Sequence, residues 1–206
     1  MNLSFRLNVF INCPFDKEYV DLLRPLIICI LALGFEPRIA LERADGADVR
    51  LEKIIELINE SMFAVHDLSR LRAKKSKEYF RLNMPFELGV DYACRLYGGG
   101  ELAEKKILIL EDKAHELKKA LSDLAGSDVE AHNNDPSRIC KIVRDWLAQS
   151  MAAPPPPPSE LWARFTDFIG ENYLALKAAR YSDEDIEGQP LRELINAMRM
   201  WLRPGF

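Results

Sequence analysis

The sequence lacks most of the short motifs that identify a known chemistry. Neither G-x-G-x-x-G nor G-x-x-x-x-G-K-[ST] occurs in the 206 residues, which argues against hydride transfer and against ATP hydrolysis by a phosphate loop. No G-x-S-x-G turn is present, and the histidines His66, His115 and His132 are far apart in the chain. These absences argue against a serine hydrolase, and we expect neither a metal site nor a cofactor.

Paired cysteines, long apolar runs and excess positive charge are also missing. The four cysteines include no C-x-x-C pair, so we interpret them as reduced thiols. The longest apolar stretch, residues 25–35, is too short to span a bilayer, and the first residues do not resemble a signal peptide. Lys and Arg number 28 against 32 for Asp and Glu, so the chain has no positive field for a nucleic-acid duplex. We therefore expect a cytoplasmic, membrane-free protein with a small-molecule ligand.

Short apolar runs alternate with helical patterns along the first three quarters of the chain. Strands are predicted at residues 7–12, 35–41, 62–65 and 106–110 and near Val129. Helices are predicted at residues 17–33, 49–59, 84–97, 115–124 and 135–149. This alternation predicts an α/β fold, a Rossmann-like or flavodoxin-like doubly wound parallel sheet of five strands.

Five consecutive prolines, residues 154–158, interrupt this pattern. Because proline cannot continue a helix or donate to a sheet, they predict a stiff linker at 152–158 between an α/β domain at 1–151 and a helical hairpin at 159–206. The hairpin either packs on the α/β domain or presents an aromatic face to a partner, formed by Trp162, Phe165, Phe168 and Trp201. We expect a homo-oligomer.

Polar residues follow the first and third predicted strands. Ligands of open parallel sheets bind beyond the carboxyl ends of the strands. Asn12, Pro14 and Phe15 follow strand one; Asp67 and Ser69 follow strand three. A carboxylate at this place can orient a ribose hydroxyl, and a hydroxyl can contact a phosphate. The alternative for both segments is simple turn formation.

A long connection between residues 67 and 84 is rich in basic side chains. Its charge suits phosphate groups, and Arg70 and Arg81, nearest its ends, are the best candidates. A solvated loop without a ligand is the alternative. A second loop, residues 42–50, follows strand two and would lie at the same edge of the sheet.

Glu87 is the candidate catalytic residue. Asn83 and Pro85 are typical of a helix start, which places Glu87 in the first turn, where the helix dipole favours an ionised carboxylate. Such a group in an apolar frame, here Met84 and Phe86, can stabilise or trap the cation formed when a glycosidic bond breaks. Asn83 and Phe86 complete the predicted substrate-binding residues. A glutamate at this position is also common for capping alone.

The order of these segments resembles a known group of proteins. Asn12-Cys13-Pro14-Phe15, then Asp67-Leu68-Ser69, then the run from Asn83 to Val90 with its Phe-Glu-Leu-Gly step, are similar to the nucleoside 2-deoxyribosyltransferase and Toll/interleukin receptor (TIR)-like group. The similarity is greatest to bacterial TIR-like nucleotide-binding proteins and covers nearly the whole chain, proline-linked helical tail included. It implies that Glu87 is the catalytic glutamate. It also implies ligand-facing positions at Asn12, Pro14, Phe15, Asp67 and Ser69.

The residues and the resemblance together lead to three hypotheses. The first is an N-glycosidase or deoxyribosyltransferase-like enzyme that acts on NAD or a nucleotide, and the resemblance implies a role in bacterial antiphage defence. In it, Glu87 stabilises or traps the ribosyl cation, Asp67 and Asn12 orient the sugar, and Ser69 and Arg70 hold phosphate. The second is a non-catalytic sensor that binds a nucleotide signal at the same place. The third is a structural or assembly module that acts through the C-terminal hairpin.

Overall fold

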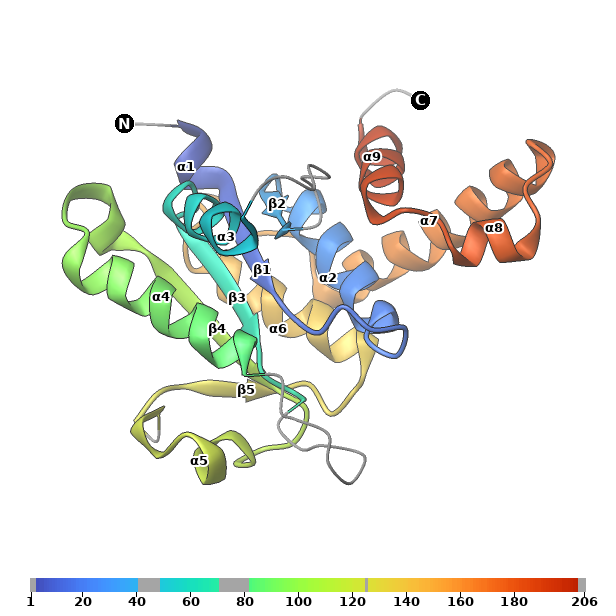
Figure 1. Cartoon of the computed structure of the whole chain (residues 1–206). Helices are drawn as coiled ribbons and strands as arrows, with labels where there is room; N and C mark the ends of the chain where they lie inside the picture. Colours follow the sequence, from blue (N-terminus) through green and yellow to red (C-terminus); the bar gives the residue numbers. More distant parts are fainter. Residues whose placement is uncertain (1–2, 41–48, 71–81, 125, 204–206) are drawn as a thin grey trace, which may run out of the picture.

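A computed structural model describes residues 3–40, 49–70, 82–124 and 126–203. Its sheet is built from β1 (Asn8–Asn12), β2 (Glu36–Arg38), β3 (Phe63–Asp67), β4 (Lys106–Glu111) and β5 (Val129–Ala131). All neighbouring strands are parallel, in the order β2-β1-β3-β4-β5 (Figure 1). The predicted doubly wound α/β fold is confirmed. Strand order reverses between β1 and β3, so the binding position of such sheets lies at their carboxyl ends.

Helices cover both faces of the sheet (Figure 1). One face carries α2 (Val20–Ala32) and α6 (Pro136–Ala148); the other carries α3 (Arg50–Asn59) and α4 (Asn83–Tyr97). Side chains of a strand alternate between the two faces. Val9, Ile11 and Val65 therefore pack toward α2 and α6, whereas Phe10 and Ala64 pack toward α3 and α4.

Several short elements differ from the sequence expectation. The helix predicted at residues 115–124 is only α5 (Leu117–Ala120) followed by the 3-10 helix η3 (Ser122–Leu124). Its start is set by Glu111, whose buried carboxylate accepts the backbone N–H groups of His115 and Leu117, each at 2.8 Å. Three further short helices were not predicted: α1 (Leu3–Leu7), η2 (Gly100–Glu104) and α8 (Asp183–Glu187).

The C-terminal helices α7 (Pro158–Ala178) and α9 (Leu191–Leu202) form a third layer outside α2 and α6 (Figure 1). Their buried side chains, Leu161, Phe168, Leu194, Ile195 and Met198, belong to the same core as α2 and α6. Phe168 is buried, and the centre of its ring lies 5.8 Å from the centre of the Trp201 ring. The predicted aromatic face is thus largely used within the chain, by packing on the α/β body, and it gives no support of its own to the expected homo-oligomer.

The proline segment is tied to the body. The Arg144 guanidinium donates to the carbonyls of Pro155 and Pro156, each at 2.9 Å. Polyproline carbonyls are free to accept such bonds because the segment has no internal hydrogen bonds. In the described residues, no helix combines the length and apolar character needed to cross a membrane.

Candidate functional site

The last two residues of β3 point to opposite faces of the sheet and begin two separate polar networks. His66 shares a face with Ala64 and points toward α4, whereas Asp67 shares a face with Val65 and points toward α2 and α6. Both side chains are fully buried. Because β3 lies at the centre of the sheet, the two networks begin at its carboxyl edge, one on each face.

Asp67 is the centre of the first network. Its carboxylate accepts the Tyr19 hydroxyl at 2.5 Å and the Ser69 backbone N–H at 2.9 Å, and also accepts the Ser69 hydroxyl. His132 Nε2 lies 3.0 Å from the same carboxylate. Burial alone would raise the pKa of Asp67, but the hydrogen bonds from His132, Ser69 and Tyr19 together lower it. Asp67 is therefore an ionised internal anchor that joins the segments after β1, β3 and β5.

Ser69 and His132 lie 2.8 Å apart, but their arrangement is not that of a serine nucleophile and its base. The backbone N–H of Asn134 donates to His132 Nδ1 at 3.0 Å, so Nδ1 is an acceptor and the proton of a neutral ring lies on Nε2. Nε2 then donates to Ser69 and Asp67 and has no lone pair to take the hydroxyl proton. In a serine triad the carboxylate binds Nδ1 of the histidine, whereas Asp67 lies beside Nε2 of His132.

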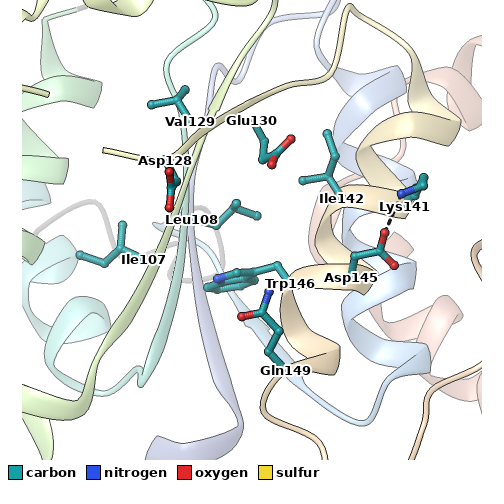
Figure 2. Close-up of a pocket in the computed structure, with 10 residues that line it drawn as sticks. All are labelled: Ile107, Leu108, Asp128, Val129, Glu130, Lys141, Ile142, Asp145, Trp146 and Gln149. Carbon is teal, nitrogen blue, oxygen red and sulfur yellow. Dashed lines mark hydrogen bonds and ion pairs between the residues drawn. The ribbon is translucent and has the colours of Figure 1, made fainter. Parts of the chain in front are cut away.

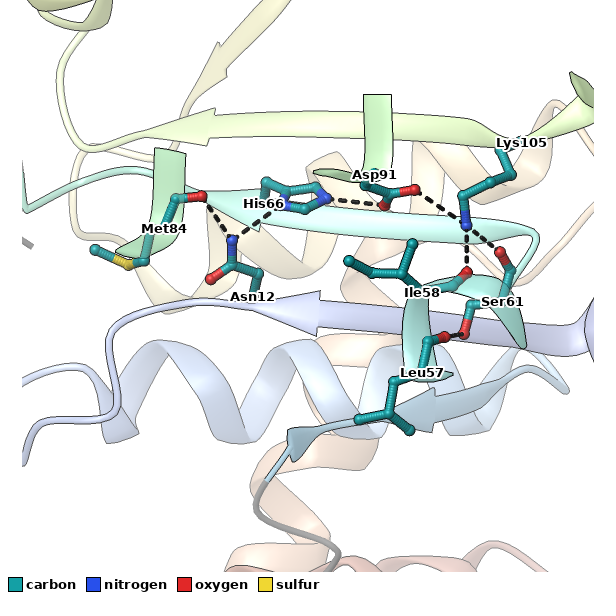
Figure 3. Close-up of polar contacts among 8 residues, drawn as sticks. All are labelled: Asn12, Leu57, Ile58, Ser61, His66, Met84, Asp91 and Lys105. Carbon is teal, nitrogen blue, oxygen red and sulfur yellow. Dashed lines mark hydrogen bonds and ion pairs between the residues drawn. The ribbon is translucent and has the colours of Figure 1, made fainter. Parts of the chain in front are cut away.

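The second network runs under α4 (Figure 3). The Asn12 amide donates to the Met84 carbonyl at 2.9 Å and to His66 Nδ1 at 3.0 Å. His66 Nε2 is consequently the protonated nitrogen, and it donates to Asp91 at 3.0 Å. The other Asp91 oxygen lies 3.1 Å from the ammonium of Lys105.

Lys105 ends this network at the amino edge of β4. Its ammonium donates to the carbonyl of Ile58 at 2.7 Å and to that of Ser61. Burial lowers the pKa of Lys105, and the carboxylate of Asp91 opposes that shift. With His66 neutral, one positive and one negative charge balance inside the protein, as a buried ion pair requires.

These contacts position Glu87. Met84, Glu87 and Asp91 lie on the buried face of α4, three and four residues apart. Asn12 binds the backbone carbonyl of Met84. His66 and Lys105 bind the side chain of Asp91. The α4 backbone on both sides of Glu87 is thereby tied to β1, β3 and the start of β4.

Glu87 itself is buried without a hydrogen-bond partner in the described part of the chain. Only 7% of its surface is exposed. Burial raises the pKa of Glu87 from 4.5 to about 7, and the positive charge of Arg50, the first residue of α3, acts in the opposite direction. A carboxylate that changes protonation near neutral pH is typical of functional sites.

The predicted reason for an ionised Glu87 was wrong. Because α4 begins at Asn83, Glu87 is its fifth residue, and the first turn contains no acidic side chain. The helix dipole acts mainly within the first turn, so burial dominates and raises the pKa. Glu87 is therefore a titrating group near neutral pH and not a permanently ionised carboxylate.

Cys13 lies where these carboxylates converge. Burial raises the pKa of its thiol well above the ordinary range, and the nearby charges of Asp67, Glu87 and Asp16 raise it further. The segment after β1, the last residue of β3 and a residue of α4 are thus brought to one place. The thiol stays protonated, which argues against a cysteine nucleophile.

The other predicted ligand residues have different surroundings. Pro14 is buried, and Phe15 is half-buried against the main core. Arg70 is bound to Asp16 at 3.3 Å and to Glu18 at 3.2 Å, so its charge joins the segments after β3 and β1.

Phe86 does not form the predicted apolar wall. It is 56% exposed on the outer side of α4, and Asn83 is exposed at the start of that helix. Met84, the other residue predicted for this wall, is buried on the same helix face as Glu87.

Asn12, Asp67 and Ser69 also differ from the expectation that they face a ligand. The Asn12 amide nitrogen, the Asp67 carboxylate and the Ser69 hydroxyl bind other groups of the chain, as described above. Arg81 and residues 42–48 of the second candidate loop lie outside the described residues.

Sequence reasoning missed Tyr19, His132, Asp91 and Lys105. A signal existed for His132, which directly follows β5 and therefore lies at the same edge as Asp67. Asp91 also had a signal, because it follows Glu87 by four residues on a helix.

Comparison with protein-family models, with curated proteins and with solved structures finds no match to this chain.

Proposed function

We propose that the chain is a nucleotide-binding enzyme of the N-glycosidase class, with Glu87 as its catalytic carboxylate and NAD or a nucleotide as its substrate. The observation that carries this proposal is a buried glutamate, without a hydrogen-bond partner among the described residues, at the carboxyl edge of a doubly wound sheet beside its switch point. The resemblance to TIR-like and deoxyribosyltransferase-like proteins supports the same residue. A role in antiphage defence rests on that resemblance alone.

The chemistry requires the ionised form of Glu87. As the bond between the anomeric carbon and the base nitrogen breaks, its electrons leave with the base, and positive charge develops on the sugar. An ionised carboxylate stabilises this charge or forms an ester with the anomeric carbon, which water then hydrolyses. Little water surrounds a buried carboxylate, so its attraction for the cation is stronger than in solution.

The surrounding residues receive revised roles. Asn12 and Asp67, predicted to orient the sugar, are positioning residues in this proposal, because Asn12 holds the backbone of α4 and Asp67 joins the segments at the edge. Arg50, exposed and close enough to affect Glu87, is the candidate for binding phosphate.

Glu87→Gln tests the catalytic role. Purified protein at high concentration is incubated with NAD, nucleosides and nucleotides, and base release is followed by chromatography. We expect release by the wild type and a loss of at least about 100-fold in Glu87→Gln, because an amide cannot supply the negative charge. Glu184→Gln, an exposed change on α8, is the matched control. Unchanged release by Glu87→Gln would refute the assignment, and tight binding without turnover would identify a nucleotide sensor.

Arg50→Gln tests the electrostatics of the site. The rate should rise with pH through about 7 in the wild type, because the deprotonated form of Glu87 reacts. Since Arg50 lowers the pKa of Glu87, its loss should move this rise to higher pH. Arg95→Gln, on the opposite end of α4, should leave the profile in place. A rate that is independent of pH between 5.5 and 8.5 would contradict the role of Glu87.

A further inference from the structure

A groove away from the Glu87 site lies where the sheet is incomplete. The strand β4 has six residues, but β5 pairs only with its last three, Ile109 to Glu111. Beside the first half of β4 is a pocket of about 510 Å³, bounded on one side by the strands and on the other by α6 (Figure 2).

The backbone of Ile107 faces this open side. Lys106 donates to the Met62 carbonyl, and the Leu110 carbonyl accepts from Leu68, so the even-numbered residues of β4 bond toward β3. The odd-numbered residues bond the other way, as shown by the Glu111 carbonyl, which accepts from His132. No strand of the described chain reaches Ile107 on that side, which leaves its N–H and carbonyl available to an added strand.

The walls of the groove combine apolar and acidic groups (Figure 2). Leu108, Ile142 and the half-buried Trp146 form the apolar side, and the Phe63 ring holds the indole edge-on at 5.6 Å between ring centres. An aromatic ring of this kind can pack on an extended side chain and attract a cation.

The acidic groups give the groove an uncompensated negative charge. Asp145 is neutralised by Lys141 at 2.6 Å and by Arg144 at 2.9 Å. Asp128 and Glu130 are exposed, and within the described ranges no cation forms an ion pair with either. These two carboxylates disfavour a second copy of this chain in the groove, since pairing two copies edge to edge would bring like charges together.

We propose that the groove binds an extended peptide segment with basic side chains, which adds as a strand beside Ile107 and places a cation between Asp128 and Glu130. Backbone hydrogen bonds to Ile107 align the segment. Apolar residues pack against Leu108 and Trp146, and the charge of the groove selects basic sequences. This surface is independent of the Glu87 chemistry.

The test uses the full chain and the acetylated, amidated peptide Val-Arg-Val-Lys-Val. Binding is followed by nuclear magnetic resonance at the Ile107 amide and the Trp146 indole N–H. Both signals should shift and saturate. The double variant Asp128→Asn/Glu130→Gln should weaken binding by at least about fivefold, because two charge contacts are lost. Asp167→Asn/Glu184→Gln, with the same change in net charge on the C-terminal helices, should not.

Two further peptides separate the parts of the proposal. The same peptide with Glu in place of Arg and Lys should not saturate, and an N-methylated form, which cannot donate to the Ile107 carbonyl, should bind at least about tenfold more weakly. Equal binding of the acidic or methylated peptide, or full binding to the Asp128→Asn/Glu130→Gln variant, would overturn the proposal. So would an absence of shifts with the basic peptide, or shifts that depend on protein concentration alone, which would assign the groove to a second copy.

Discussion

Asp91→Ala is expected to lower the free energy of unfolding by about 3–5 kcal/mol, the range for breaking a buried ion pair by removal of one partner. Asp91 and the ammonium of Lys105 are inaccessible to solvent, 3.1 Å apart. Without the carboxylate, Lys105 has a buried charge with no counter-charge, and the Nε2 proton of His66 loses its acceptor. Urea denaturation of the wild type and the variant at pH 7 measures the difference.

A second substitution separates loss of charge balance from loss of packing. The double variant Asp91→Ala/Lys105→Met removes both charges, so it should recover part of the stability lost in Asp91→Ala. Asp167→Ala, an exposed change on α7, should alter stability by less than about 0.5 kcal/mol. A loss of under about 1 kcal/mol in Asp91→Ala would show that the network does not hold α4 as described.

Glu87→Gln is expected to have the opposite effect and to stabilise the protein at alkaline pH by about 3 kcal/mol. The folded protein raises the pKa of Glu87 from 4.5 to about 7, so it binds the proton more tightly than the unfolded chain does. Ionised Glu87 therefore destabilises the fold, and a rise of this size corresponds to about 3 kcal/mol. Glutamine resembles the neutral acid in shape and does not ionise.

The pH dependence gives this prediction its sign. Below pH 4.5 the carboxyl is protonated in both states, and the wild type and Glu87→Gln should be nearly equal in stability. As the pH rises from 4.5 to 7, the unfolded chain loses its proton first, and the wild type falls behind the variant. Above pH 7 the difference is constant. Urea denaturation at pH 5, 7 and 8.5 measures it, with Glu184→Gln as control; destabilisation of Glu87→Gln at pH 8.5 would contradict the prediction.

The two acidic residues of α4 thus have opposite effects on stability. Asp91 has partners and holds the helix in place, whereas Glu87 lacks a hydrogen-bond partner among the described residues and is costly to ionise. A residue kept at a cost to stability is expected at a working site, because function commonly requires groups that the fold alone would not favour. The comparison of the two variants therefore tests the site without requiring the substrate to be known.

Much of the fold could be predicted because its signals are local. The alternation of short apolar runs with helical patterns defines a parallel α/β sheet, and Pro136 after Asp135 marks the start of α6. The helix over residues 115–124 was overestimated at both ends. Its start depends on Glu111, which lies outside that stretch, and Leu121 leaves the helical conformation with φ −126° and ψ 79°. The placement of Phe86 failed for a related reason, since the side of a helix that is buried depends on what packs against it.

By itself, the sequence determined the strand and helix order, the absence of phosphate-loop and dinucleotide motifs, and the presence of Glu87 on a helix that follows β3. Only the tertiary structure decided that Glu87 is buried and has a raised pKa, that His132 meets Asp67, and that Asp91 meets Lys105. The physical reason is distance along the chain. Strand and helix patterns arise from neighbouring residues, whereas burial and charge pairing arise between segments that approach one another only in the folded protein.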